Sequence, residues 1–121
     1  MCTFPPRECG IATFSNNLLG ALQKQILVKP EVSVVAIESP QDTHAYPAVV
    51  GFVVRQEHQR DYLEAAAYIN HSGADICLIQ HEYGIYGGES GIYLLSLLHQ
   101  LTIPVLATLH TVVEAPSFNE R

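Results

Sequence analysis

The chain has 121 residues, 48% of them hydrophobic, and a formal net charge of −6. This length suits one domain, or part of one, with a buried core, and the few scattered Lys and Arg residues argue against binding to a nucleic-acid backbone. No apolar run approaches the roughly 20 residues that a membrane-spanning helix needs, no leader peptide opens the chain, and three cysteines without C-x-x-C spacing suit a reducing compartment, so we expect a cytoplasmic protein.

Hydrophobic periodicity predicts helices where apolar residues recur every three or four positions, and strands where short β-branched runs are bounded by proline or glycine. The resulting alternation is typical of an α/β domain with a mostly parallel sheet covered by helices on both faces. In chain order, the predicted elements are a helix at 11–26, strands at 32–37 and 49–54, a helix at 59–71, a strand at 76–80, a helix at 90–101 and a strand at 104–109.

The same periodicity predicts which side chains of each helix face the core. Each predicted helix carries one apolar stripe, and the second helix closes at Gly73. The predicted inward residues are Ile11, Phe14, Leu18, Leu22 and Ile26 in the first helix, Tyr62, Ala65, Ala66 and Ile69 in the second, and Leu94, Leu97, Leu98 and Leu101 in the third.

Both ends of the chain are expected to be truncated. Residues 1–4 are too short for a strand, yet Pro5-Pro6 followed by a helix-opening glycine is what should come after a first, central strand. At the other end, Ser117-x-x-Glu120 has the form of a capping box, so a helix is predicted to begin where the chain stops.

Three polar loops follow strand positions and are expected to share the carboxyl edge of the sheet, where ligands bind in open α/β folds. The first ends at Gly10, the second begins with His81 and Glu82, and the third begins with His110. Gly10 opens a helix, so either its backbone N–H faces an anion or the glycine only makes a tight turn. A single glycine is not the G-x-G-x-x-G fingerprint of dinucleotide binding.

Two further features of these loops have alternative interpretations. Arg7, the basic residue of the first loop, either binds a phosphate or carboxylate or pairs with Glu8 or solvent. The N–H groups around Gly87 and Gly88, before the third helix, form either a second anion or hydroxyl site or merely a bend in the chain.

The histidines are interpreted by position. His81, at the end of an apolar strand, either donates to a sugar hydroxyl or a developing charge or bonds to backbone. His81, Glu82 and His110 are also ordinary zinc-ligand types, but no close-spaced pair such as H-x-x-x-H supports a metal site, and none is expected. The remaining four are predicted to be solvated, namely His44, His58, His71 and His99.

Three strings carry a resemblance to a known family. They are T-F-P-P-R-E-C-G-I-A-T-F at 3–14, Q-H-E-Y-G-I-Y-G-G-E at 80–89 and L-H-T-V at 109–112. In this order, and over essentially the whole chain, the sequence resembles the amino-terminal domain of glycosyltransferase family 4 enzymes, which are retaining enzymes of the GT-B fold.

The resemblance implies that residues 1–121 are part of a Rossmann-like three-layer domain, the acceptor-side half of a GT-B fold, without the carboxyl-terminal donor-binding domain. Such an enzyme transfers a sugar from a nucleotide-sugar donor to a hydroxyl of a sugar or lipid-linked acceptor, with retention and without a metal ion or other cofactor. This domain alone is expected to be inactive. The alternative is a stand-alone Rossmann-like binding or interaction module without catalytic activity.

The resemblance also implies roles for individual residues. His81 matches the histidine that approaches the donor sugar and is the predicted catalytic residue. Gly10, Arg7 and Ile11 match the donor phosphate- or sugar-binding loop. The predicted acceptor-side loop residues are Glu82, Gly87, Gly88, Glu89 and His110. Because a sheet that lacks its central strand exposes edges, self-association of the truncated domain is expected too.

Overall fold

The computed structural model describes residues 1–25 and 27–112. The described part is mixed α/β, and each predicted element has a counterpart, although the third predicted helix is divided in two. Ile26 and the capping box at 117–120 lie outside the described residues. In chain order the elements are α1 (Gly10–Gln23), β1 (Val34–Glu38), β2 (Val50–Arg55), α2 (Gln59–His71), β3 (Cys77–His81), the 3-10 helix η1 (Glu89–Gly91), α3 (Tyr93–Gln100) and β4 (Val105–Leu109).

The strands form two small parallel sheets, β1 with β2 and β3 with β4, and residues 1–3 lie between them. This segment is hydrogen-bonded to both sheets through four backbone contacts: Cys2 N to Val35 O (3.0 Å), Ile37 N to Cys2 O (2.9 Å), Met1 N to Leu78 O (2.6 Å) and Gln80 N to Met1 O (3.0 Å). The residues that looked too short for a strand therefore occupy the central position at which the sequence predicts one.

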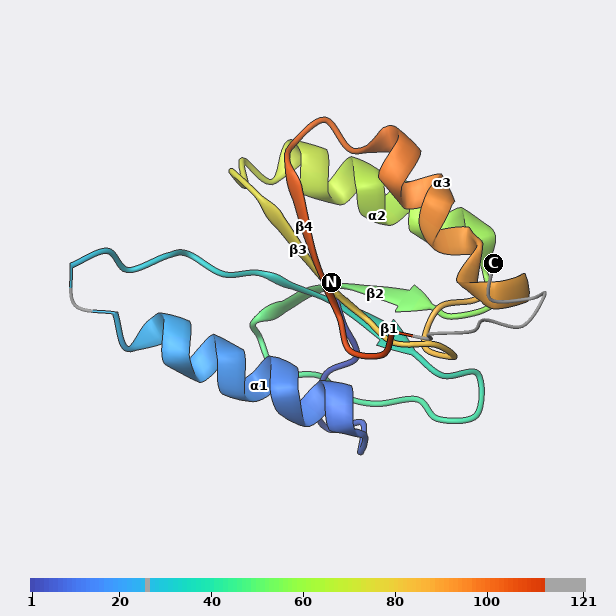
Figure 1. Ribbon diagram of the computed structural model, residues 1–121, viewed down its shortest axis with the longest axis horizontal. Helices are drawn as coiled ribbons and strands as arrows, with labels where there is room; N and C mark the ends of the chain where they lie inside the picture. The colour runs from blue at the N-terminus through green and yellow to red at the C-terminus, as the bar shows by residue number, and fades with distance from the viewer. Residues whose placement is uncertain (26, 113–121) are drawn as a thin grey trace.

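Helices lie on both sides of the strands. α2 and α3 lie side by side on one side, and α1 lies on the other (Figure 1). Residues 1–3 run parallel to β1, and the alternating bonds with β3 have the parallel pattern as well. The carboxyl ends of all strands therefore meet at one edge, and the loops after residues 1–3, after β3 and after β4 leave the sheet together, as predicted.

The core is centred on β1 and α2. Residues 34–37 of β1 are all buried. The four predicted inward residues of α2 are buried too, which confirms the periodicity there. In α3, Leu94 and Leu97 are buried, while Leu98 and Leu101 are half-buried against the same core.

The predicted stripe of α1 is confirmed only in part, because Ile11 is buried and Leu18 and Leu22 are half-buried, but the buried face includes other residues. The buried residues are Ile11, Ala12, Ser15 and Leu19, whereas Phe14 is 42% exposed. Ser15 can lie on the inner face because its hydroxyl donates to the carbonyl of Ile11 at 2.7 Å, so the polar hydrogen of this buried side chain is paired. The hydrophobic pattern alone could not reveal this satisfied serine.

The expectation of a sheet covered on both faces is wrong for β4. All five of its residues are exposed, and Leu106 and Leu109 each keep 59% of their accessible surface. The reason is that no helix in the described part of the chain packs extensively on this strand.

A forked ion pair connects β2 to α2. The Nε and Nη2 of Arg55 donate to the two carboxylate oxygens of Asp61 at 2.8 and 2.9 Å, and the Arg55 backbone N–H donates at 2.9 Å. These bonds to Arg55 lower the pKa of Asp61 below its ordinary value of 3.8. Since the folded-state pKa is depressed, this stabilisation is present above that ordinary value and is lost as the pH falls through the lowered one.

Two further findings concern the surface. His58, His71 and His99 are exposed as predicted, but His44 is half-buried, and its Nε2 is enclosed without a hydrogen-bond partner among the described residues. Its ring lies edge-on to Tyr46, with the centroids 5.9 Å apart, so the prediction of a solvated His44 is wrong. None of the described helices combines the length and the hydrophobicity that crossing a bilayer requires.

Candidate functional site at the carboxyl edge of the strands

The first loop, residues 5–9, holds the start of α1 close to the end of β1. The Sγ of Cys9 caps the helix by accepting from Ala12 N at 3.4 Å, and it lies 3.1 Å from the Thr3 hydroxyl. Arg7 donates through Nη1 to the carbonyl of Ile37, the penultimate residue of β1, at 3.3 Å. One nitrogen of the guanidinium thus fixes the loop, and its other donors have no protein partner among the described residues.

Gly10 is the first residue of α1 and lies in open space. A Cβ built on Gly10 would meet no heavy atom within 4 Å, and its backbone does not have the positive φ that favours glycine. The fold therefore does not need a glycine here, and the tight-turn interpretation loses its support. What remains is a helix N-terminus that a ligand can approach at close range.

His81 is the last residue of β3, and two tyrosines hold its ring. The imidazole stacks on Tyr86, with centroids 5.8 Å apart and planes at 15°, and meets the ring of Tyr83 edge-on at 5.5 Å. Tyr86 is itself 3% exposed, and its hydroxyl donates to the carbonyl of Gln80 at 2.7 Å. The position of the His81 ring is therefore set by a buried and anchored neighbour.

The side-chain nitrogens of His81 have no hydrogen bond to the described residues. Its Nδ1 is buried and has no hydrogen-bond partner among the described residues. The backbone carbonyl, by contrast, accepts from His110 N at 2.9 Å. The side chain is consequently not the backbone-bonded strand-end histidine of the alternative interpretation, because only its main chain is bonded.

His110 joins the third loop to the other two. Its Nε2 lies 2.9 Å from the Oε1 of the buried Gln80, and because an amide oxygen only accepts, the proton of this bond belongs to Nε2. On its other side, the ring meets Phe14 of α1 edge-on, with centroids 4.7 Å apart. The exposed Phe14 thus contributes to the site rather than to the core.

Glu82 also connects two loops. Its Oε2 accepts from the hydroxyl of Thr111 at 2.7 Å, and its Oε1 accepts from Tyr83 N at 2.9 Å. These two bonds, the first above all, lower the pKa of Glu82 below its ordinary value. The carboxylate is therefore ionised at neutral pH and positions the loops after β3 and β4 relative to each other.

Gly87 and Gly88 have a different role from Gly10. Gly87 N donates to the hydroxyl of Tyr62 at 2.9 Å, and Gly88 N donates to the carboxylate of Glu57 at 3.2 Å. A Cβ on Gly87 would overlap the carbonyl oxygen of Gln56, and Gly88 has a φ of +77°. Both N–H groups are used within the protein, which favours the bend over a second anion site.

The turn that follows also departs from the prediction. The sequence predicts one helix over 90–101, but Glu89 lies exposed in the short η1, and Ser90 has a φ of 53°. α3 starts only at Tyr93.

Burial raises the pKa of Tyr62, the partner of Gly87, to about 12, so its hydroxyl keeps its proton and can donate to the Gln56 carbonyl at 2.9 Å.

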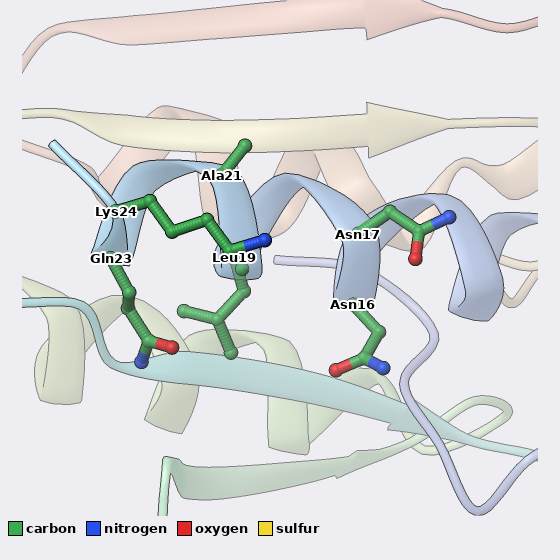
Figure 2. Close-up of a pocket in the computed structure, with 7 residues that line it drawn as sticks. Asn16, Asn17, Leu19, Ala21, Gln23 and Lys24 are labelled. Carbon is green, nitrogen blue, oxygen red and sulfur yellow. The ribbon is translucent and has the colours of Figure 1, made fainter.

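Two of the cavities formed by the described residues lie outside these loops. The larger, of about 440 Å³, runs along α1 and is lined by Asn16, Asn17, Leu19, Gly20, Ala21, Gln23 and Lys24. Figure 2 shows its side chains spread along successive turns of the helix rather than converging on one point. A surface groove of this kind does not orient a ligand, and we do not place the site there.

The smaller cavity, of about 200 Å³, lies where β1 and β2 end, at the same edge as the three loops. The sequence analysis places no candidate site residue in this part of the edge. The signal was available, because the polar run 55–58 follows the apolar end of a strand, just as His81 and Glu82 do. Its lining residues are Glu38, Ser39, Pro40, Thr43, Arg55, Gln56, Glu57 and His58.

Neither a metal centre nor a relative identifies the site. Within residues 1–25 and 27–112, no group of three or more His, Cys, Asp or Glu side chains is arranged to hold a metal ion. Comparisons of the chain with protein-family models, curated proteins and solved structures found no match. The assignment of a family therefore depends on the three sequence strings alone.

Proposed function

We propose that this chain is the acceptor-side, Rossmann-like domain of a retaining GT-B glycosyltransferase. The observation that carries the proposal is the unpartnered imidazole of His81, held by Tyr86 at the edge where Gly10 opens α1. Charged, aromatic and open backbone groups from three loops meet at this edge, where open α/β domains bind ligands.

In this proposal the first loop receives the diphosphate of the nucleotide-sugar donor. The N-terminus of the 14-residue α1 supplies a favourable dipole, and Gly10 lets the phosphate approach the backbone. Arg7 keeps donors for the same charge while it is fixed to β1. As negative charge develops on the leaving diphosphate, these groups stabilise the transition state more than the ground state.

His81 binds a hydroxyl of the donor sugar in this arrangement. An imidazole ring can donate or accept through its nitrogens, and the ring cannot rotate freely because it is stacked on Tyr86 and meets Tyr83 edge-on. Glu82 is hydrogen-bonded to Thr111, and His110 is hydrogen-bonded to Gln80, so these two residues fix the loops after β3 and β4 relative to each other. They therefore position the acceptor side and do not react themselves.

The test is an activity assay of the polypeptide that carries this domain together with a donor-binding domain. We expect release of nucleoside diphosphate from one of UDP-, GDP- or ADP-glucose, and ¹H NMR of the product should show retention of the anomeric configuration. The chain of residues 1–121 alone should release none. Inversion at the anomeric carbon would contradict the proposal, and saturable nucleotide binding without any transfer by the longer polypeptide would favour the stand-alone binding module.

A further inference from the structure

The hydroxyl of Tyr62 joins two of the loops at the carboxyl edge of the strands. Tyr62 belongs to α2 and is fully buried, with 0% of its surface exposed. Its oxygen lies 2.9 Å from the carbonyl oxygen of Gln56, in the loop after β2, and 2.9 Å from the backbone nitrogen of Gly87, in the loop after β3. A carbonyl only accepts and a peptide N–H only donates, so this hydroxyl donates to the first loop and accepts from the second.

Two outer hydrogen bonds connect the same loops. The side-chain amide of Gln56 donates to the carbonyl of Gly84 at 2.9 Å, and Gly88 N donates to the carboxylate of Glu57 at 3.2 Å. Both bonds are exposed, so water can replace either partner. By contrast, the bond between the tyrosine hydroxyl and the loop after β3 is buried. Its loss leaves a peptide N–H unpaired away from water, which costs more than the loss of an exposed bond.

The buried bond lies next to the aromatic stack that holds His81. Gly87 directly follows Tyr86, whose ring is stacked on the imidazole of His81 with the two planes at 15°. A Cβ on Gly87 would overlap the carbonyl oxygen of Gln56, so the two loops are in close contact at this point. Tyr62 bonds both members of that contact. Its hydroxyl therefore sets where the backbone beside Tyr86 lies relative to the loop after β2.

We propose that Tyr62 is a positioning residue for His81. Its hydroxyl fixes the peptide that follows Tyr86, and the ring of Tyr86 fixes the imidazole at the edge of the sheet. In its effect on turnover, this inference rests on the proposed function, in which His81 binds a hydroxyl of the donor sugar. Tyr62 has no exposed surface and acts only through these neighbours. Misplacement of a reacting group by about 1 Å costs about a hundredfold in rate, so a remote hydroxyl can influence turnover.

The same helix supplies a matched control. The hydroxyl of Tyr68, also in α2, lies 2.7 Å from the hydroxyl of Ser33. Ser33 directly precedes β1, so this bond lies at the amino ends of the strands, away from the three loops. Tyr68→Phe thus removes one tyrosine hydroxyl and one hydrogen bond from α2 without touching the loop that carries His81.

The test is the NMR spectrum of the histidine rings in the full-length polypeptide that carries this domain. Tyr62→Phe keeps the ring that meets Tyr93 edge-on and loses only the hydroxyl. The ring protons of His81, identified by their absence in His81→Ala, should be displaced in the wild type by the ring current of Tyr86. In Tyr62→Phe they should move toward the positions of an exposed histidine, whereas Tyr68→Phe should leave them unchanged.

Turnover gives a second readout. In the activity assay, Tyr62→Phe should lower kcat about tenfold, with little change in the KM of the donor, because the first loop binds the diphosphate. Unchanged His81 signals in Tyr62→Phe, an equal displacement in Tyr68→Phe, or a wild-type kcat in an active enzyme would each overturn the inference.

Two further outcomes are separated by design. If the wild type transfers no sugar but the His81 signals move as expected, Tyr62 positions His81 and only the proposed function is wrong. If circular dichroism shows that Tyr62→Phe does not fold, Gln56→Ala decides instead, because it removes the outer bond to Gly84. It should displace the His81 signals in the same direction by a smaller amount, and no displacement would overturn the inference.

Discussion

Two glycine-containing loops lie at the carboxyl edge of the strands, and they use glycine for opposite reasons. Around Gly87 and Gly88, the protein itself fills the space of a side chain and uses both N–H groups. At Gly10 the same space is empty. The difference teaches that a glycine near a site is a candidate for ligand contact only when the fold does not need it.

The largest effect should come from Gly87→Ala, on stability. The new Cβ would overlap the Gln56 carbonyl, and relief of the clash requires movement of the backbone. We expect the free energy of unfolding to fall by about 3 kcal/mol, as for severe overpacking, and Tm by roughly 10 °C. Gly20→Ala, in open space on α1, is the matched control and should not lower Tm. If the Gly87→Ala protein is as stable as the wild type, the fold does not require a glycine at this position, and the contrast with Gly10 is wrong.

The next largest effect is expected on turnover, and it tests the roles of His81 and Glu82. In the polypeptide with a donor domain, His81→Ala should lower kcat by about ten- to a thousandfold, as for loss of one stabilising donor, with little change in the KM of the acceptor. Glu82→Gln, which keeps an oxygen for Thr111, should lower kcat far less. Full activity of His81→Ala, or loss of its fold in circular dichroism, would make His81 a structural residue.

Gly10→Val tests the open loop itself. The fold leaves space for a Cβ at this position, and a valine would occupy the space proposed for the diphosphate, so we expect kcat/KM for the donor to drop at least about tenfold, or about 1.4 kcal/mol. Gly20→Val, on the same helix with equal space, should keep wild-type kinetics. If the two variants behave alike, Gly10 has no special relation to the donor.

The smallest effect should be that of metal removal. Since the proposal has helix and side-chain groups stabilise the leaving diphosphate, treatment with a chelator should leave turnover unchanged, and elemental analysis should find no stoichiometric zinc. One zinc per chain, with stability lost on chelation, would favour metal chemistry at His81, Glu82 and His110 instead.

Local pattern sufficed for much of the fold. The predicted helix at 59–71 has the same bounds as α2, because its apolar residues repeat at a period that only a helix buries on one side. The pattern failed where tertiary contacts decide. The pattern could not predict that the buried Ser15 hydroxyl would donate a hydrogen bond to a carbonyl of its own helix. It also could not predict that residues 1–3 would be hydrogen-bonded to β1 on one side and to β3 on the other.

The candidate site was predictable in its position but not in its internal contacts. Loops that follow parallel strands must meet at one edge, so the proximity of His81, Glu82 and His110 follows from topology. The stack of His81 on Tyr86 depends on side-chain packing within a turn, and the bond between Gln80 and His110 depends on strand register. Neither leaves a periodic signal in the sequence.

The central position of residues 1–3 has a consequence for the order of folding. The hydrogen bond from Met1 to Leu78 joins residues 77 positions apart in the chain. A polypeptide synthesised only as far as β2 can therefore pair residues 1–3 with β1, and β1 with β2, but the other side of residues 1–3 stays unpaired. The two halves join only after β3 exists, which makes their union a late, non-local event. Until then, the free side of this segment has unpaired backbone groups with which another extended peptide could pair.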